Sequence, residues 1–488
     1  MKKVFIYILL PITGMLMMSG CEDALKLYPP DGLIKEEFWQ TKEDVESVLM
    51  AGYQSLSNLD SRLFYYGELR ADMLDDGGNL GANHRNIMES NIYPSNKWVD
   101  WSPFYSVINN CNLVLKYAPD VLEIDPTFSE FKFNTMNAEA VFLRSLAYFY
   151  MVRIWKDVPF VLTAYDSDTQ EFFLEKTDGS IILDSINVQL ENILQYAPED
   201  HETLARTRGR STSGAVNALL ADIALWEFNY QDCIDYVTRV EESSLYELVP
   251  GDSWFRMFYE GNTLEGIFEI QFDSEAGQNN SMYDITKPQS NNFIASEFAL
   301  ELFSAEMFGE IIRGYGSVRE SDKIIWKYVG QSADGLMFRS GSNLKSTNWI
   351  VYRLADLLLM KAEALAQLGR FNEALQIVND IRTRAFVNPY SQFQQTPQAF
   401  EDMILEERAK ELAYEGKRWF DLMRMGRRNS YARKDKLIEI IINNVPATQK
   451  RVLAAKLSDP NGWYLPVSSD EIENNLKLVQ NPYYQVYE

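Results

Sequence analysis

Cysteine and histidine are rare in this sequence, which holds three cysteines and two histidines in 488 residues. A fold held together by disulfides needs many more cysteines, so that class of small secreted scaffold is excluded. His84 and His201 both lie in polar surroundings, so a histidine-based zinc centre or a Ser-His-Asp triad is difficult to assemble. The sequence therefore predicts no cofactor and no metal site.

Basic residues are also scarce relative to acidic ones. Lysine and arginine together number 46 against 70 aspartates and glutamates, which gives a formal net charge of −24. A surface of this sign repels phosphate backbones. Nucleic acid is therefore excluded as an expected partner, whereas neutral and cationic ligands stay open.

Long apolar runs are missing beyond the first twenty residues. There, two lysines precede an apolar run over residues 4–18 and the small pair Ser19-Gly20, which is the pattern of a bacterial export signal over residues 1–20. A membrane-spanning helix is the weaker alternative, because the run is short and contains Pro11 and Gly14.

Cys21 follows this apolar run directly. The Met-Ser-Gly-Cys stretch that it ends resembles the lipobox of bacterial lipoproteins, with Met18 where leucine is more usual. The resemblance implies that the Cys21 thiol is acylated and that lipid chains anchor the protein to the outer membrane. Glu22 and Asp23 are similar to the acidic signal that sends some lipoproteins to the cell exterior.

Two cysteines remain after such processing, Cys111 and Cys233, and both lie in apolar helical patterns. We expect each to be a buried free thiol, because free cysteine is among the most buried residue types. A Cys111–Cys233 disulfide is the alternative.

Helical periodicity dominates the rest of the chain. Residues 137–155 are apolar around most of the helix and predict a buried helix, which Pro159 prevents from continuing. Residues 214–228 carry small side chains at helical spacing, which favours close helix packing. Residues 352–385 predict a helical hairpin with Gly369 in its turn.

That hairpin resembles a tetratricopeptide repeat, and a second copy precedes it. Residues 368–375 match residues 227–234 position by position, with Cys233 at the place of Ala374. Phe228 stands where the other copy has Gly369. Cys233 is thus expected to be a packed small residue.

Less regular segments, rich in Gly, Asn, Asp, Ser and aromatic residues, separate the helical ones. They cover residues 69–101, 163–178 and 251–345. We divide the chain into a signal at 1–20, an N-terminal helical-repeat region at 22–235, a loop-rich segment at 236–345 and a C-terminal region at 346–488. Residues 22–488 are expected to form one compact unit.

Six charged residues follow one another at gaps of three or four near the C-terminal third of the chain, a spacing that puts them on one helical face. They are Arg408, Glu411, Glu415, Arg418, Asp421 and Arg424. We interpret them as an interhelical ion network rather than as a catalytic acid and base, with Gly416 expected to interrupt or kink the helix. Arg144 and Arg353, inside apolar helices, are expected to be paired core charges.

Five motifs in order resemble one family, SusD/RagB. They lie within residues 137–161, 209–226, 352–385, 404–424 and 463–484, so the resemblance covers essentially the whole mature chain. It implies a mainly α fold on a tetratricopeptide-like scaffold with irregular loop-rich segments. It also implies a surface lipoprotein that binds a nutrient, most often an oligosaccharide, and delivers it to a SusC-like TonB-dependent transporter.

Catalytic motifs are missing from the sequence. It contains no GxxxxGK phosphate loop, HExxH, CxxC or GxSxG pattern. The protein is therefore expected not to be an enzyme. A peptide binder of the RagB type and a lipid-anchored glycosidase that uses only carboxylates are the alternatives. The acidic loop 71–79 has oxygen ligands for calcium, but a solvated turn is favoured.

Sugars are bound by stacking on aromatic rings and by hydrogen bonds to planar polar groups. Trp101 fits a helical packing position, whereas Trp98 lies just outside that helix in an irregular segment. The predicted ligand site combines Trp98 with polar residues of the preceding loop and two aromatic residues of the middle segment. Its members are Trp98, Asn96, Asp72, Asn79, Arg85, Tyr283 and Trp326.

Overall fold

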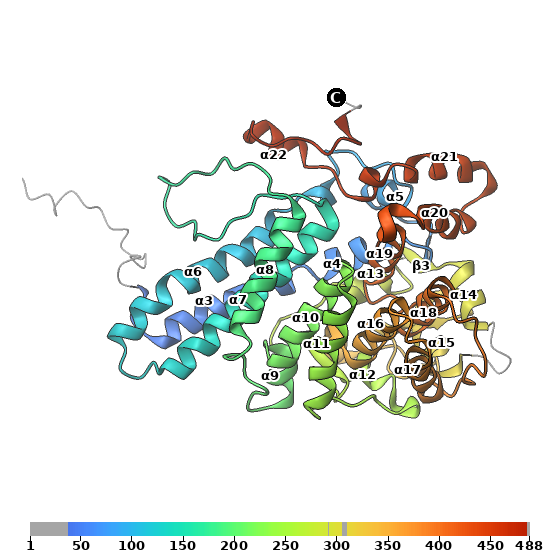
Figure 1. Cartoon of the computed structure of the whole chain (residues 1–488), viewed down its shortest axis with the longest axis horizontal. Coiled ribbons are helices and arrows are strands. Elements are labelled where there is room, and N and C mark those ends of the chain that lie inside the picture. The colour runs from blue at the N-terminus through green and yellow to red at the C-terminus, as the bar shows by residue number, and fades with distance from the viewer. Residues whose placement is uncertain (1–37, 291, 305–309, 486–488) are drawn as a thin grey trace, which may run out of the picture.

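The computed structural model describes residues 38–290, 292–304 and 310–485, and this part of the chain is mainly helical (Figure 1). The lipidation site predicted at Cys21 lies outside these residues. No helix among the described residues has the length and apolar character needed to cross a lipid bilayer.

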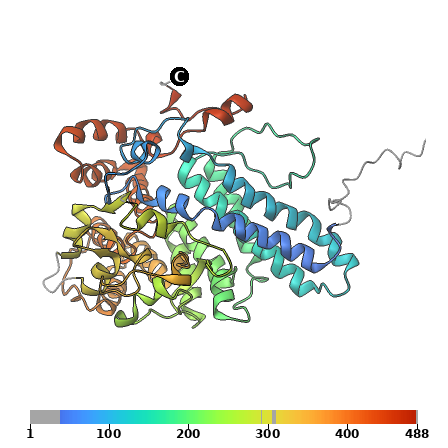
Figure 2. The ribbon, with the colours of Figure 1, turned by 180° about the vertical axis from the view of Figure 1, so that it is seen from behind.

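Four long helices form a bundle at one end of the molecule (Figure 1). They are α3 (Lys42–Ser57), α6 (Ser102–Ile124), α7 (Glu130–Trp155) and α8 (Gly179–Ile193). α3 lies along α6, and α6 lies along α7, as the reverse view also shows (Figure 2). α7 is buried over nearly all of its second half because its sequence is apolar on every side.

Two helical hairpins continue from the bundle, and they confirm the predicted repeats. The first joins α10 (Ser213–Trp226) to α11 (Tyr230–Glu242), and the second joins α16 (Leu354–Gln367) to α17 (Phe371–Arg384). α11 packs against α16, so the two hairpins stack. Cys111 and Cys233 are both buried and free, as expected.

The turns of the two hairpins have the same backbone path. Gly369 has φ +77°, and Phe228 at the matching place has φ 66°. In each turn the next amide donates back to the helix, from Asn229 to Ala224 O at 2.8 Å and from Arg370 to Leu365 O at 2.9 Å. Phenylalanine thus adopts a left-handed conformation that normally favours glycine.

Three small antiparallel sheets are found in the described residues, each of two strands. β1 (Leu74–Asp76) pairs with β3 (Phe293–Ala295), with Leu74 opposite Ala295. β2 (Gly266–Ile270) pairs with β6 (Trp349–Arg353). β4 (Val318–Arg319) pairs with β5 (Ile324–Ile325). The first two sheets thus link the loop-rich middle segment to β1, in the N-terminal region, and to β6, which precedes α16.

The other helices lie mostly in the irregular and C-terminal segments, and most of them are shorter than the bundle helices. They are α4 (Asp60–Glu68), α5 (Ala82–Met88), α9 (Leu204–Gly209), α12 (Arg256–Tyr259), α13 (Met282–Thr286), α14 (Glu297–Ser304), α15 (Ile311–Ser317), α18 (Pro397–Glu411), α19 (Arg418–Tyr431), α20 (Lys434–Asn443), α21 (Ala447–Leu457) and α22 (Ser469–Asn474). Short 3-10 turns include η2 (Lys97–Val99), η4 (Trp326–Tyr328) and η6 (Pro460–Trp463). One hydrophobic cluster extends from Val45 to Tyr484 and therefore joins the two ends of the described chain.

A buried ion network centred on Glu411 confirms the structural interpretation of the charge ladder. Glu411 is 0% exposed and forms ion pairs with Arg353 at 2.6 Å, with Arg313 at 3.2 Å and with Arg384. Burial raises the pKa of Glu411, but the three guanidinium groups outweigh burial and hold it well below its usual value. The ladder does not occupy one continuous helix, however. α18 ends at Glu411 and α19 begins at Arg418, with Gly416 at φ +73° between them.

The two other predicted core charges differ from each other. Arg353 is paired as expected, with Glu265 at 2.7 Å and Glu415 at 2.9 Å as well as with Glu411. Arg144 is buried but makes no ion pair in the described residues. Its guanidinium donates to the neutral amide oxygens of Asn112 and Gln189, both at 2.6 Å. The expectation of a paired charge was therefore wrong for Arg144.

Candidate functional site

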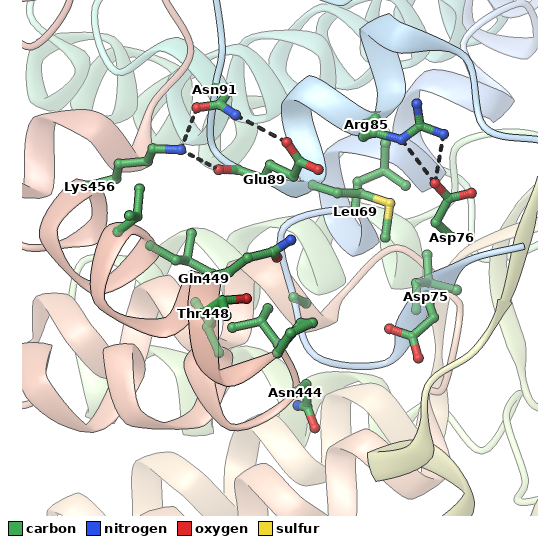
Figure 3. Close-up of a pocket in the computed structure, with 18 residues that line it drawn as sticks. Leu69, Asp75, Asp76, Arg85, Glu89, Asn91, Asn444, Thr448, Gln449 and Lys456 are labelled. Carbon is green, nitrogen blue, oxygen red and sulfur yellow. Dashed lines mark hydrogen bonds and ion pairs between the residues drawn. The ribbon is translucent and has the colours of Figure 1, made fainter. Parts of the chain in front are cut away.

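A groove lies between the loop-rich N-terminal segment and the C-terminal helices (Figure 3). One wall is formed by β1 and α5, and the other by α20, α21 and the turn between them. Its volume is about 440 Å³, within the range of about 300–1,000 Å³ typical of ligand pockets. We name this cavity the α5 groove.

Polar side chains border the α5 groove and several are held in place. The Arg85 guanidinium donates to one carboxylate oxygen of Asp76 at 3.0 and 2.8 Å. Lys456 Nζ donates to the Glu89 carbonyl at 3.0 Å and to the Asn91 side chain, while Asn91 donates to the Glu89 carboxylate at 3.1 Å (Figure 3). These contacts fix the orientation of the rim before any ligand arrives.

Other polar side chains in the groove are Asp75, Asn444, Thr448 and Gln449 (Figure 3). Burial raises the pKa of Asp75, and Lys323 partly offsets this effect. The rest of the lining is aliphatic and includes Leu69, Leu74, Met88, Ile441, Val445 and Leu453. None of the described residues that line the groove is aromatic.

Arg85 is the member of the predicted site that lines this groove. It projects from α5 and is exposed. Asn79 is exposed nearby, in the loop after β1, and its side-chain amide donates to the Ser290 carbonyl at 3.0 Å.

Trp98 does not line the groove; it packs against the side chain of His84, which is on α5, and is half-buried. Its ring also meets Tyr65 edge-on at 4.6 Å, and Lys97 Nζ lies 4.3 Å from the ring centre. Within the described residues, Trp98 Nε1 and His84 Nε2 have no hydrogen-bond partner. Asn96 is buried, where it caps η2 by accepting from the Trp98 amide at 3.0 Å.

Two further predicted site residues are buried, like Asn96. Asp72 is buried, and its two oxygens accept from Arg418 at 2.7 and 2.6 Å. Trp326 is 0% exposed, packs edge-on against Phe338 and donates from Nε1 to the Ser332 carbonyl at 2.5 Å. The buried Trp326 ring therefore has no free face on which a sugar could stack, and both oxygens of Asp72 are occupied by Arg418. Tyr283, on α13, is half-buried and packs against the hydrophobic cluster that contains Trp326.

The predicted residues therefore do not line one common cavity: only Arg85 is part of the described lining of the α5 groove. Sequence reasoning missed the opposite wall of the α5 groove, residues 441–456. Its apolar periodicity and the proline at 446 mark a pair of helices, but nothing in the local pattern indicates that they face β1. That relationship depends on the packing of segments more than 350 residues apart.

Comparison with known proteins finds SusD and SusD-like proteins. A sequence model of the SusD family matches residues 324–484, and a model described as starch-binding and associating with the outer membrane matches residues 33–225. A SusD-like protein of Formosa agariphila is 26% identical, with 96% of each chain covered.

Solved structures agree in fold. A SusD superfamily protein from Bacteroides vulgatus superposes with a TM-score of 0.75 at 21% identity, covering 91% of this chain and 100% of its own. A laminarin-binding SusD-like protein superposes with a TM-score of 0.72 at 20% identity, covering 91% of this chain and 99% of its own. The mainly helical fold, the ordered motifs and these matches lead to one conclusion: the chain belongs to the SusD/RagB family.

Proposed function

We propose that this protein binds an oligosaccharide at the cell surface and delivers it to a SusC-like TonB-dependent transporter in the outer membrane. The observation that carries the proposal is the α5 groove, an accessible cavity with a fixed polar rim in a chain of the SusD family. The laminarin-binding relative and the description of the second family model support a glycan as the ligand.

The groove suits binding better than catalysis. Of the three acids in the described lining, Asp76 is engaged by Arg85, Glu89 accepts from Asn91, and Asp75 comes from the same strand as Asp76, β1. A glycosidase needs two carboxyl groups on opposite sides of the bond that it cleaves. We therefore propose a non-catalytic protein in which Arg85, Asn91, Asn444 and Gln449 hydrogen-bond the sugar hydroxyls.

A peptide ligand is the second candidate, and one observation favours it. The groove has an aliphatic floor and a charged rim but no aromatic ring in its described lining. This combination accommodates apolar side chains and a polar backbone as well as it accommodates a sugar.

Affinity electrophoresis of the purified protein in gels that contain starch, laminarin, xylan, mannan or polygalacturonate tests the proposal. We expect retardation in at least one gel without release of sugars. Released sugars would show an enzyme, and migration unchanged in every gel would contradict glycan binding and favour the peptide.

The anchor rests on Cys21, as the lipobox resemblance implies. Cys21→Ala should abolish labelling with palmitate and release the protein from the outer-membrane fraction. Continued labelling of the variant would refute acylation at this position.

A further inference from the structure

A second cavity, of about 290 Å³, lies where several helices of the repeat scaffold meet the C-terminal segment. The C-terminal ends of α7, α10 and α19 border it together with the N-terminal end of α8. Unlike the α5 groove, it is lined by four aromatic rings, from Trp226, Phe228, Tyr431 and Tyr464. We name it the aromatic pocket.

The four rings differ in solvent exposure, so some form the buried base of the pocket and one lies at its opening. Trp226 and Tyr464 are buried, Phe228 is half-buried, and Tyr431 is 37% exposed. The Arg427 guanidinium lies 4.2 Å from the centre of the Trp226 ring and donates to the Trp226 carbonyl at 3.2 Å. Tyr431 meets Trp463 edge-to-face at 5.5 Å, but it is the most exposed of the four rings and therefore the one that an incoming molecule can reach.

Polar groups in the aromatic pocket fall into two sets. Asp157 accepts from the Gly179 amide at 3.1 Å, and Asp178 caps α8 by accepting from the Ser180 amide at 2.8 Å. Within the described part of the chain, by contrast, Lys156 Nζ makes no hydrogen bond and no ion pair.

The Glu227 carboxylate and the hydroxyl groups of Tyr431 and Tyr464 likewise have no hydrogen-bond partner among the described residues. Lys156 and Tyr431 are exposed and Glu227 is half-buried, so these groups are open to water and to a ligand. Donors and acceptors both converge on this cavity, which is the arrangement that a polyhydroxyl ligand requires.

The backbone around the pocket is strained at three places. Lys156, Phe228 and Tyr431 have φ angles of 71°, 66° and 67°, and all three line the cavity. Each left-handed residue other than glycine costs on the order of 1 kcal/mol, and such residues concentrate at ligand sites. The matching turn of the other hairpin has Gly369, which adopts a positive φ without this free-energy cost. Phe228 therefore places an aromatic ring at a position where glycine would be less strained.

We infer that the aromatic pocket binds one or two sugar residues of a neutral glycan, stacked on Tyr431 and hydrogen-bonded by Lys156, Glu227 and Tyr464. The inference rests on the proposed glycan-binding function and adds a contact point outside the α5 groove. A volume near the lower limit of ligand pockets suits a short unit of a longer chain. Three carboxylates and two cations line the pocket, a net charge of −1 that disfavours an anionic glycan, so the ligand carries no acidic group.

Four variants in the same polysaccharide gels test the inference: two in the pocket, one control, and Arg85→Ala in the α5 groove. We expect Tyr431→Ala and Lys156→Gly each to bind the retarding glycan about tenfold more weakly. Lys156→Gly removes the amine and relieves a left-handed backbone, so its thermal midpoint should not fall. This keeps the test valid even where Tyr431→Ala disturbs folding. Tyr315→Ala, which removes an exposed tyrosine on α15, is the matched control.

The outcomes separate the two proposals. Wild-type protein that is retarded by no polysaccharide would overturn the proposed function and this inference with it. Retardation that Arg85→Ala weakens but both pocket variants leave unchanged would overturn the aromatic pocket alone. Pocket variants that lose binding only to polygalacturonate would overturn the neutral ligand class. Weaker binding to a neutral glycan in both pocket variants, with Tyr315→Ala unchanged, supports the inference.

Discussion

The ion network around Glu411 and the aromatic pocket are both rich in charged side chains, but they differ in how those charges are paired. Glu411 has three arginine partners and is fully buried. In the described chain, Lys156 and Glu227 in the aromatic pocket have no ion-pair partner and are partly accessible.

This difference separates structure from binding. A carboxylate that three guanidinium groups already surround has no capacity left for a ligand or for proton transfer. An accessible, unpaired group beside an aromatic ring has that capacity. An acidic cluster in the sequence is thus a weak indicator of function until the partners of each carboxylate are known.

The largest expected effect comes from breaking the ion network. Glu411→Gln would leave Arg313, Arg353 and Arg384 buried with one carboxylate fewer, and should lower the free energy of unfolding by about 3–5 kcal/mol. Urea unfolding monitored by tryptophan fluorescence measures the change. Glu202→Gln, which breaks an exposed ion pair with Arg206, is the control and should change stability by less than about 1 kcal/mol. Equal effects of the two variants would contradict the structural role of the network.

Acid should weaken the neighbouring buried pairs. Burial raises the pKa of Asp356, but Lys417 and Arg408 outweigh burial and bring it to about 2. Burial is likewise outweighed at Glu363, chiefly by Arg424, and the pKa of Glu363 is also about 2. Unfolded aspartate and glutamate titrate near about 4. Both carboxylates therefore stabilise the folded protein above about pH 4, and this contribution is lost as the pH falls toward 2.

We expect the free energy of unfolding to fall by on the order of 2 kcal/mol for each of these two groups between about pH 4 and pH 2. Urea unfolding at a series of pH values measures the slope. A free energy of unfolding that stays constant across this interval would show that the two carboxylates are not held in ion pairs.

Much of the fold could be predicted from the sequence, because it follows from local patterns. The apolar periodicity of residues 137–155 and the repeat around Gly369 each specify a helix or a turn without knowledge of the remaining chain. The ligand site could not be predicted as well. Trp326 and Asp72 lie in irregular segments of the kind that usually carry function, yet the tertiary packing buries them.

The aromatic pocket could not be predicted from the sequence either. Phe228 was recognisable as a departure from the repeat, where it replaces a turn glycine. Its neighbours in the pocket, Tyr431 and Lys156, lie about 200 and 70 residues away in the sequence. The packing of α7, α10 and α19 brings them together, so the spacing of residues within any one segment does not predict the pocket.

The smallest expected effects concern the two hairpin turns, and they test whether Phe228 serves the pocket or the core. A Cβ added at Gly369 meets no atom within 4 Å, so Gly369→Ala isolates the backbone cost of a left-handed residue. We expect this variant to lower the free energy of unfolding by about 1 kcal/mol.

Phe228→Gly removes the backbone strain, which stabilises the fold by a similar free energy, but it also loses the burial of a half-exposed ring. Its net change in the free energy of unfolding should therefore be smaller than that of Gly369→Ala. Thermal unfolding of both variants provides the comparison. A larger loss for Phe228→Gly would mean that the ring is held by packing, and the strain at Phe228 would then no longer support a binding role for the aromatic pocket.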